Sequence, residues 1–446
     1  MNTRKLILDV DTGIDDALAL AYLATFDQVE LLGVIGTYGN VAADTAVCNT
    51  RHVLGLLGRD DVPVMRGETH PSWAAAFIPD AGCAQFHGTD GLGGFGPGRA
   101  VRMDDSTAAD GRSSFAPAYP QAGSPADSDD SAVTAVMAAD SANDDGPAVR
   151  SLISVGGYAT HDPHANPAGD AIALSFVTHD DAARGSADRS PTVSDGVRFI
   201  IDAVREHGTD LTVVTTGPLT DIDAALRIAP DIVGKLSLVM MGGTLTQEGN
   251  CWDLTAETNI IQDPEAADRV FHSGADITMI GLDVTHQCLL GRAVTRRWRD
   301  VADMLERGMA IPASATATGF APADSEDLPA TPRHPFGPQA LRFLADIADF
   351  SIAANLKADA RLFSKGMPLH DPLAAAVAVD PTLVSCLDLP MKVETQTGDC
   401  HGTRGRTIGD PEGLIDPQAP RVHVALHVDV RRFVGEFTDR IAGVRR

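Results

Sequence analysis

The feature that most constrains the fold is an acidic turn near the start of the chain, formed by four aspartates: Asp9, Asp11, Asp15 and Asp16. The apolar run Lys5–Val10 that leads into this turn is too short for a helix and predicts a buried strand. After the turn, apolar residues recur at helical spacing, which predicts a helix that begins near Asp15. A buried strand followed at once by a helix is typical of an α/β domain.

Four carboxylates in one turn repel one another unless a cation lies among them. Oxygen ligands at this density suit a hard divalent ion, Ca²⁺ or Mg²⁺. Helix capping, worth about 1 kcal/mol, would account for one such aspartate but not for four. The turn is therefore a candidate metal site.

The acidic turn also resembles two other known motifs, and the local sequence alone does not exclude either of them. The spacing Asp9-x-Asp11-x-Gly13 resembles part of a calcium-binding loop, although it lacks the glutamate of that loop and follows a strand. It also resembles the nucleophile motif of haloacid-dehalogenase phosphatases. In that reading Asp9 is the nucleophile, although Gly13 stands where the motif has Thr or Val.

The composition excludes several classes of partner. A formal net charge of −26 makes association with nucleic acid or an anionic membrane electrostatically unfavourable. No apolar run is long enough to span a bilayer, and the first predicted strand leaves no room for a signal peptide. The six cysteines are scattered without a Cys-x-x-Cys pair, which indicates neither a zinc site nor a disulfide framework. We therefore expect a cytoplasmic protein.

Strand-like apolar runs alternate with helical segments along the chain. These runs are Leu31–Thr37, Val62–Met65, Leu211–Thr216, Leu236–Met241 and Ile277–Leu282. The alternation predicts an α/β fold with a mostly parallel, Rossmann-like central sheet flanked by helices. The run Val422–Val430 alternates and predicts a terminal antiparallel strand. Ligands of such sheets collect at the carboxyl ends of the strands, where the acidic turn would lie.

Two polar stretches interrupt this pattern. Residues 98–190 form a long low-complexity insertion, of which about 98–150 is rich in Ala, Asp, Ser and Gly and predicts disorder. A second polar insertion spans 311–338. We expect the remainder of 1–446 to form a single domain.

Further short motifs follow downstream, and each of them alone can be explained as a turn or a helix cap. They are Gly39-Asn40, the Gly-rich loop His87–Gly94, Thr215–Thr220, Met241–Gly243 with Asn250 and Glu257–Asn259, and His370–Pro372 at the start of an Ala-rich helix. Taken in order with the acidic turn, these motifs resemble the nucleoside hydrolase family of the inosine–uridine preferring type. The resemblance covers residues 4–97, about 191–310 and about 339–430.

The resemblance implies the nucleoside hydrolase fold and Ca²⁺-dependent hydrolysis of the N-glycosidic bond of ribonucleosides, as in purine or pyrimidine salvage. In the family pattern the cation is held by Asp11, Asp16, the backbone carbonyl of Thr216 and Asp371. Asp11 would also be the general base that takes a proton from the attacking water. The family is homo-oligomeric, so the resemblance implies a homodimer or homotetramer.

The remaining matched positions concern the substrate. Residues that match those hydrogen-bonded to the ribose hydroxyls are Asp15, Asn250, Glu257 and Asn259, and Asn40 matches a position near the diol and the water. His370, with His87 as a second candidate, would assist departure of the base. The block Gly281–Gln287 also resembles the family, and we interpret it as architectural.

The chain departs from the family pattern at Thr12, where Pro is common, and at Thr258, where many members have an aromatic residue. The segment Met241–Asn250 is also one residue longer than usual. These departures leave the preferred base undetermined. A protein that binds a nucleoside or calcium without catalysis is the alternative from a different functional class.

Overall fold

The computed structural model describes residues 3–97, 193–251, 254–309, 334–397 and 401–444. The predicted insertion at 98–190, with its disordered part, lies outside these described residues, as does 311–333 of the second insertion. The last residue of that second insertion, Pro338, begins a helix. In the described part of the chain, no helix is both long and apolar enough to cross a membrane.

The fold is built on a nine-stranded sheet with the order β10-β9-β11-β6-β5-β4-β1-β2-β3. Its strands are β1 (Arg4–Val10), β2 (Val29–Gly36), β3 (Val64–Arg66), β4 (Leu211–Thr215), β5 (Ser237–Met241), β6 (Asp276–Ile280), β9 (Val384–Val393), β10 (Thr407–Gly409) and β11 (Arg421–Val428). All neighbours from β11 to β3 are parallel, whereas β9 is antiparallel to both β11 and β10. The predicted mostly parallel α/β sheet is confirmed. The strand predicted at Val422–Val430 is antiparallel to β9 but also parallel to β6, and it ends at Val428.

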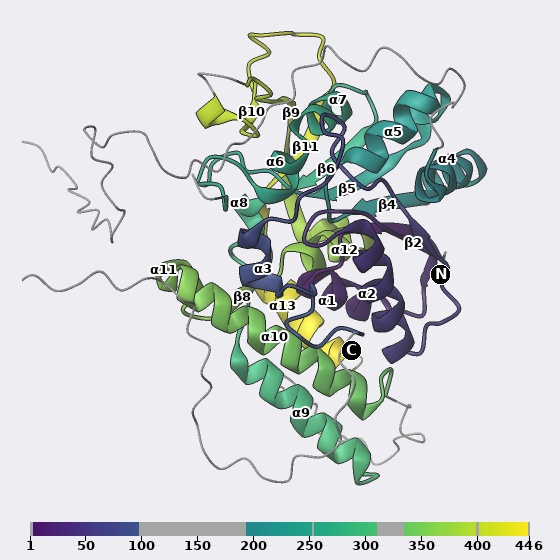
Figure 1. Ribbon diagram of the computed structural model, residues 1–446, viewed down its shortest axis with the longest axis vertical. Coiled ribbons are helices and arrows are strands. Elements are labelled where there is room, and N and C mark those ends of the chain that lie inside the picture. The colour runs from purple at the N-terminus through teal and green to yellow at the C-terminus, as the bar shows by residue number, and fades with distance from the viewer. Residues whose placement is uncertain (1–2, 98–192, 252–253, 310–333, 398–400, 445–446) are drawn as a thin grey trace, which may run out of the picture. The chain divides into compact units, whose positions relative to one another are not determined.

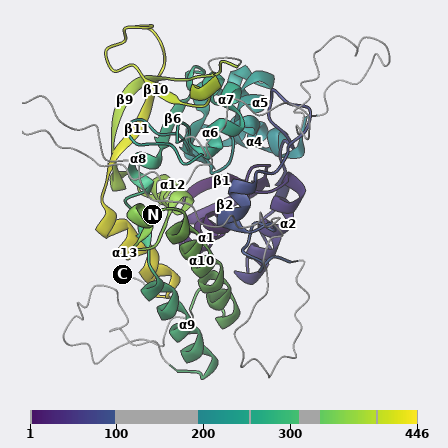
Figure 2. The ribbon, with the colours of Figure 1, turned by 60° about the vertical axis from the view of Figure 1, so that its left-hand side comes forward.

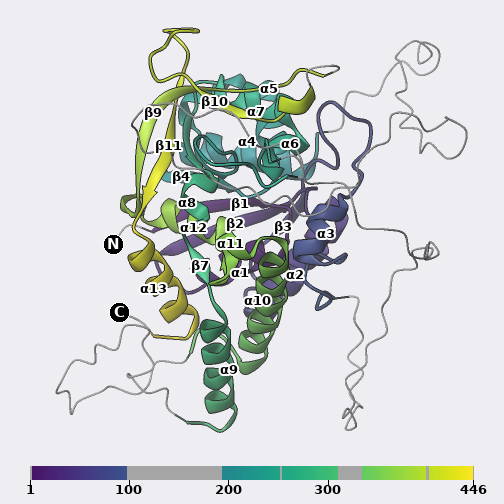
Figure 3. The ribbon, with the colours of Figure 1, turned by 90° about the vertical axis from the view of Figure 1, so that its left-hand side faces the viewer.

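Helices cover both faces of this sheet (Figures 1 and 3). The helices are α1 (Ile14–Leu23), α2 (Ala43–Leu56), α3 (Ala81–His87), α4 (Asp195–His207), α5 (Thr220–Ile228), α6 (Thr258–Gln262), α7 (Pro264–Phe271), α8 (Leu282–Thr285), α9 (Arg292–Glu306), α10 (Pro338–Ala358), α11 (Ala360–Phe363), α12 (His370–Val379) and α13 (Val430–Ile441). Short 3₁₀ helices lie at Gly208–Asp210, Pro230–Lys235, Pro381–Leu383 and His401–Thr403. A separate two-stranded sheet pairs β7 (Leu289–Leu290) with β8 (Met367–Pro368). Figure 2 shows α9 and α10 lying side by side below the sheet.

The sheet divides the interior into two apolar cores. Successive side chains of β1 alternate between them, with Leu6 and Leu8 in the core beneath α1 and Ile7 in the core beneath α4 and α5. Strands buried on both faces have near-continuous apolar sequences, which explains why these runs were readable as strands.

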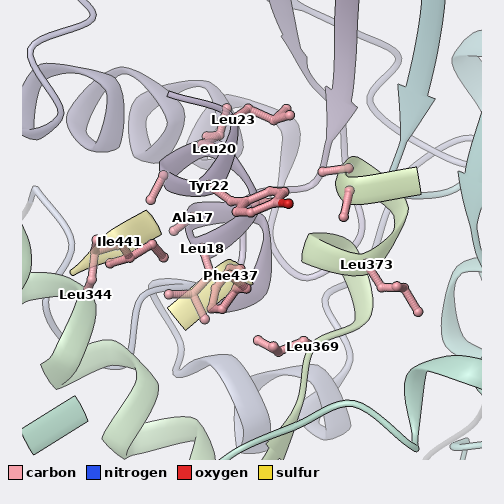
Figure 4. Packing of buried hydrophobic residues seen from close by; sticks show 14 of the residues in the cluster. Ala17, Leu18, Leu20, Tyr22, Leu23, Leu344, Leu369, Leu373, Phe437 and Ile441 are labelled. Carbon is pink, nitrogen blue, oxygen red and sulfur yellow. The ribbon is translucent and has the colours of Figure 1, made fainter. Parts of the chain in front are cut away.

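Helix α1 is buried along its whole length. Tyr22 packs against Phe437 of α13 with ring centroids 5.5 Å apart, and Leu373 of α12 belongs to the same buried cluster (Figure 4). Each large apolar side chain buried in this way contributes roughly 1.5–3 kcal/mol. The packing fixes the N-terminal end of α1, and with it the acidic turn, at the carboxyl end of β1.

Candidate active site

The centre of the site is a group of buried carboxylates from two distant parts of the chain. Asp15, Asp16 and Asp371 each place a carboxylate oxygen within 4.8 Å of the others. Asp15 and Asp16 lie in the first turn of α1, and Asp371 lies in the first turn of α12, which packs directly against α1. The structure therefore brings the acidic turn and position 371 together.

Asp11 lies beside this group, between β1 and α1, and is fixed by Asn40. Its Oδ2 accepts a hydrogen bond from the Asn40 backbone N–H at 2.7 Å, and its Oδ1 accepts one from Asn40 Nδ2 at 2.9 Å. A Cβ at Gly39 would meet the Asp11 carboxylate, so only glycine leaves room for this contact. The carboxylate of Asp11 is therefore held in one orientation.

Asp16 connects the acidic turn to the end of β4. Its Oδ1 accepts a hydrogen bond from Thr216 Oγ1 at 2.6 Å, and its Oδ2 accepts one from the Gly13 N–H at 2.7 Å. The Thr216 carbonyl oxygen in turn accepts a hydrogen bond from Asn259 Nδ2 at 2.8 Å. Three of the predicted site residues thus form one continuous network.

Burial raises the pKa of every carboxylate in the group, and the charges of neighbouring aspartates add to this for Asp11, Asp16 and Asp371. Burial raises the pKa of both Asp15 and Asp16 to about 6, and that of Asp11 and Asp371 well above its usual value. The charges of Asp15 and Asp16 raise the pKa of Asp371 further. Oδ1 of Asp15 has no hydrogen-bond partner among the residues that the structure describes. Buried, unpaired oxygen donors of this kind fit a hard divalent cation, which would offset their repulsion.

Two histidines flank the group. His87, at the end of α3, accepts a hydrogen bond at Nδ1 from the Ile14 N–H at 3.1 Å and lies 3.7 Å from Asp15 Oδ1. Burial lowers the pKa of His87 to about 4, so this ring is neutral near pH 7 and carries its proton on Nε2. His370 precedes Asp371, and its Nδ1 lies 2.8 Å from Thr285 Oγ1. Burial lowers its pKa well below the usual value.

Three of the predicted substrate-binding residues, Asn250, Glu257 and Asn259, lie in α6 or just before it. Glu257 caps this helix by accepting hydrogen bonds from the N–H groups of Asn259 (3.0 Å) and Ile260 (3.1 Å), and it also accepts one from the Gly243 N–H (2.9 Å). Burial raises the pKa of Glu257 to about 7. Glu257 and Asn259 are therefore connected to the acidic group through Thr216.

Asn250 lies on the loop before α6. Its Oδ1 accepts hydrogen bonds from both the backbone N–H (2.9 Å) and the hydroxyl (3.0 Å) of Thr258. Thr258, which departs from the family pattern, therefore orients Asn250. The Asn250 amide nitrogen remains available to donate a hydrogen bond to a substrate.

Asp9 lies near the carboxyl end of β1 and has a different main neighbour from the other aspartates of the turn. It alternates with Leu8 and Val10, and its fully buried carboxyl faces Asp221 at the start of α5. Burial and then the charge of Asp221 raise the pKa of Asp9 well above its usual value. A phosphatase nucleophile must reach a substrate, and this environment opposes that role for Asp9.

The structure also identifies contacts that the sequence interpretation missed. We interpreted Gly281–Gln287 as architectural, yet Thr285 contacts His370 directly, and the His286 and His370 rings lie 5.7 Å apart. The only sequence signal for these contacts was the position of this segment directly after a predicted strand.

Comparisons with known proteins agree with this geometry. The family described as "Inosine-uridine preferring nucleoside hydrolase" matches residues 6–435. The pyrimidine-specific ribonucleoside hydrolase RihA of a Shewanella strain is 26% identical over 440 residues, covering 99% of this chain and 96% of the relative. RihA of an Enterobacter strain is 26% identical over 438 residues, covering 98% and 97%.

Solved structures show the same relationship. The purine-preferring ribonucleoside hydrolase from Gardnerella vaginalis is 35% identical, with a TM-score of 0.62 over 99% of each chain. The inosine-uridine preferring nucleoside hydrolase from Bacillus anthracis, at 18% identity and a TM-score of 0.56 over 99% of each chain, shares the fold. From these matches over nearly its whole length, the chain belongs to the inosine-uridine preferring nucleoside hydrolase family and is a nucleoside hydrolase enzyme.

Proposed function

We propose that the protein hydrolyses the N-glycosidic bond of ribonucleosides to ribose and free base, with Ca²⁺ bound at the acidic group. The observation that carries this proposal is the convergence of the buried carboxylates of Asp15, Asp16 and Asp371. Such a group is costly to assemble unless it holds a cation. Non-catalytic calcium binding would leave the adjoining network of Asn40, Glu257 and Asn259 without a role.

The ligands that we propose for Ca²⁺ are Asp11, Asp16, Asp371 and the carbonyl oxygen of Thr216, whose oxygens suit this ion. When bound, Ca²⁺ supplies positive charge that orients the ribose hydroxyls and makes water more acidic. Asp15 shares the same group, and its unpaired Oδ1 is available to accept a hydrogen bond from a ribose hydroxyl.

Asp11 is the general base in this proposal. Its carboxylate, fixed by Asn40, accepts a proton from water while the water oxygen bonds to C1′ of the ribose. The C1′–N bond breaks, and its electron pair leaves with the base. The carboxylates around the sugar stabilise the positive charge that develops at C1′. His370 and His87 donate hydrogen bonds to the departing base.

Release of ribose in the presence and absence of the cation tests the proposal. With Ca²⁺, the protein is expected to release reducing sugar from uridine or inosine. A chelator should abolish that release, because the repelling carboxylates then lack their counter-charge, and added Ca²⁺ should restore it. Phosphatase activity on a nucleotide monophosphate without ribose release, or nucleoside binding without turnover, would replace the proposal with one of its alternatives.

The buried polar network predicts selection for the ribose hydroxyls. A 2′-deoxyribonucleoside would leave an acceptor such as Asp15 Oδ1 unpaired, and sites built around a hydroxyl reject analogues that lack it by a factor of about 10⁴–10⁵ at the limit. We expect kcat/KM for deoxyuridine to be lower than that for uridine by at least about 10². Equal values for the two substrates would contradict the assigned role of this network.

A panel of pyrimidine and purine ribonucleosides identifies the preferred base, since the similar proteins include both a pyrimidine-specific and a purine-preferring hydrolase. We propose that the protein is cytoplasmic and forms a homodimer or homotetramer, in line with the family resemblance. We also propose that residues 98–190 are an insertion into one domain, because the residues on both sides of this segment belong to one compact unit.

A further inference from the structure

We propose that Thr285 is a positioning residue for departure of the base. Its hydroxyl donates a hydrogen bond to Nδ1 of His370, and this bond keeps the imidazole proton on Nε2, where it can be offered to the base. The inference rests on the proposed function and assigns a role to the segment that we had interpreted as architectural.

The backbone fixes Thr285 and His370 relative to each other. Thr285 ends α8 and His370 begins α12, and the strands β7 and β8 that lie next to these two helices pair with each other. The Leu369 N–H also donates to the Cys288 carbonyl at 2.9 Å. The distance of 2.8 Å between Thr285 Oγ1 and His370 Nδ1 is thus set by main-chain hydrogen bonds on both sides.

The direction of the bond follows from burial. Thr285 is fully buried, and the partner that the structure gives to its hydroxyl is His370 Nδ1. If Thr285 only accepted this bond, its own hydroxyl hydrogen would stay unpaired in the interior, which is costly. A donating Thr285 satisfies that hydrogen. A neutral imidazole that accepts at Nδ1 must carry its hydrogen on Nε2.

Neighbouring rings limit the other orientations of His370. The His286 ring lies 5.7 Å from the His370 ring at an interplanar angle of 58°, and Phe363 packs edge-on against His286 at 5.5 Å. Asp283, in the same short helix, accepts hydrogen bonds from the backbone N–H groups of Leu245 and Thr246 at 2.8 and 2.7 Å. The segment that carries Thr285 is therefore anchored to the rest of the site.

The chemical consequence concerns the leaving group. When the C1′–N bond breaks, its electron pair adds negative charge to the base, and the Nε2–H of His370 stabilises that charge by a hydrogen bond. The released base then takes its proton from solvent. Without the Thr285 hydroxyl, the imidazole hydrogen is free to move to Nδ1, and the base then faces a lone pair. Only substrates with poor leaving groups should be affected.

The test compares Thr285→Val with Thr285→Ser on two kinds of substrate in the presence of Ca²⁺. Uridine and inosine have poor leaving groups, whereas 4-nitrophenyl β-ribofuranoside releases a stable anion. For Thr285→Val we expect kcat on the nucleosides to fall by about 10- to 100-fold, with KM and the rate on the nitrophenyl riboside changed by less than about threefold. Thr285→Ser, which keeps the hydroxyl, should restore most of the nucleoside rate.

Thr438→Val is the matched control, because Thr438 is also buried but donates to the Val434 carbonyl in α13 at 2.8 Å, away from the site. It should leave the ratio of the two rates unchanged. Equal losses on both substrates for Thr285→Val, or no loss on either, would overturn the role of Thr285. A wild-type protein that hydrolyses none of these ribosides would instead overturn the proposed function itself.

Discussion

Replacing Asp11 by Asn is expected to lower kcat for ribose release by a factor of about 10²–10⁴, the usual contribution of a positioned general base. The side chain keeps its size, although its amide can accept only one of the two hydrogen bonds that Asn40 donates to Asp11. It loses the ability to accept the proton of the attacking water, and it also loses the charge of one proposed Ca²⁺ ligand, which excess Ca²⁺ compensates. Steady-state kinetics on uridine or inosine with excess Ca²⁺ measure the effect.

Asp221→Asn is the matched control for this substitution. Asp221 is also fully buried, and burial raises its pKa to about 6, but it lies at the start of α5 beside Asp9. Neutralising Asp221 should change kcat by less than about threefold. If Asp11→Asn keeps full activity while the protein remains folded, Asp11 is not the base, and another carboxylate of the group must take that role.

Most of the parallel sheet could be predicted because its strands are buried on both faces. The runs that became β1, β2, β4, β5 and β6 consist almost entirely of apolar residues and end at turns. β9 was missed, because Asp388 and Pro390 interrupt its pattern and several of its side chains are exposed. Its pairing depends on β11, which lies far along the chain. Such tertiary partners leave no local signal.

The site was predictable only where residues are close in sequence. The acidic turn indicated a cation by itself, but the approach of Asp371 to it could be expected only from the family resemblance. Asp9 and Asp11 are only two residues apart, yet their partners differ, Asp221 for Asp9 and Asn40 for Asp11, and those partners come from distant parts of the chain. The contacts of Thr285 with His370 and of Thr258 with Asn250 depend on side-chain geometry that spacing does not encode.

Asp371→Asn is expected to have opposite effects on stability with and without the cation. Burial raises the pKa of Asp15 and Asp16 to about 6, above the ordinary 3.8, so the folded metal-free protein binds these protons more tightly than the unfolded chain does. This contribution to stability is present at low pH and is lost as the pH rises through about 6. At about pH 8, repulsion within the group destabilises the metal-free protein.

Removing the charge of Asp371 relieves part of that repulsion, so the metal-free variant should melt at a higher temperature than the metal-free wild type at about pH 8. Ca²⁺ at 100 times its Kd should stabilise the wild type by about 2.7 kcal/mol. A tenfold loss of affinity in the variant would remove about 1.4 kcal/mol of this gain. Thermal unfolding with chelator and with Ca²⁺ measures both effects, and at about pH 5 the difference between the two conditions should shrink for the wild type.

Asp283→Asn is the control for Asp371→Asn, because it neutralises a buried carboxylate that we do not propose as a cation ligand. Asp283 is also buried, but its oxygens accept hydrogen bonds from the N–H groups of Leu245 and Thr246 and from the Thr246 hydroxyl. Its neutralisation weakens these charge-assisted bonds, so this variant should melt at a lower temperature in both conditions and keep the full Ca²⁺-induced shift. An Asp371 variant that melted at a lower temperature in both conditions and kept the full Ca²⁺-induced shift, as expected for Asp283→Asn, would remove Asp371 from the ligand set.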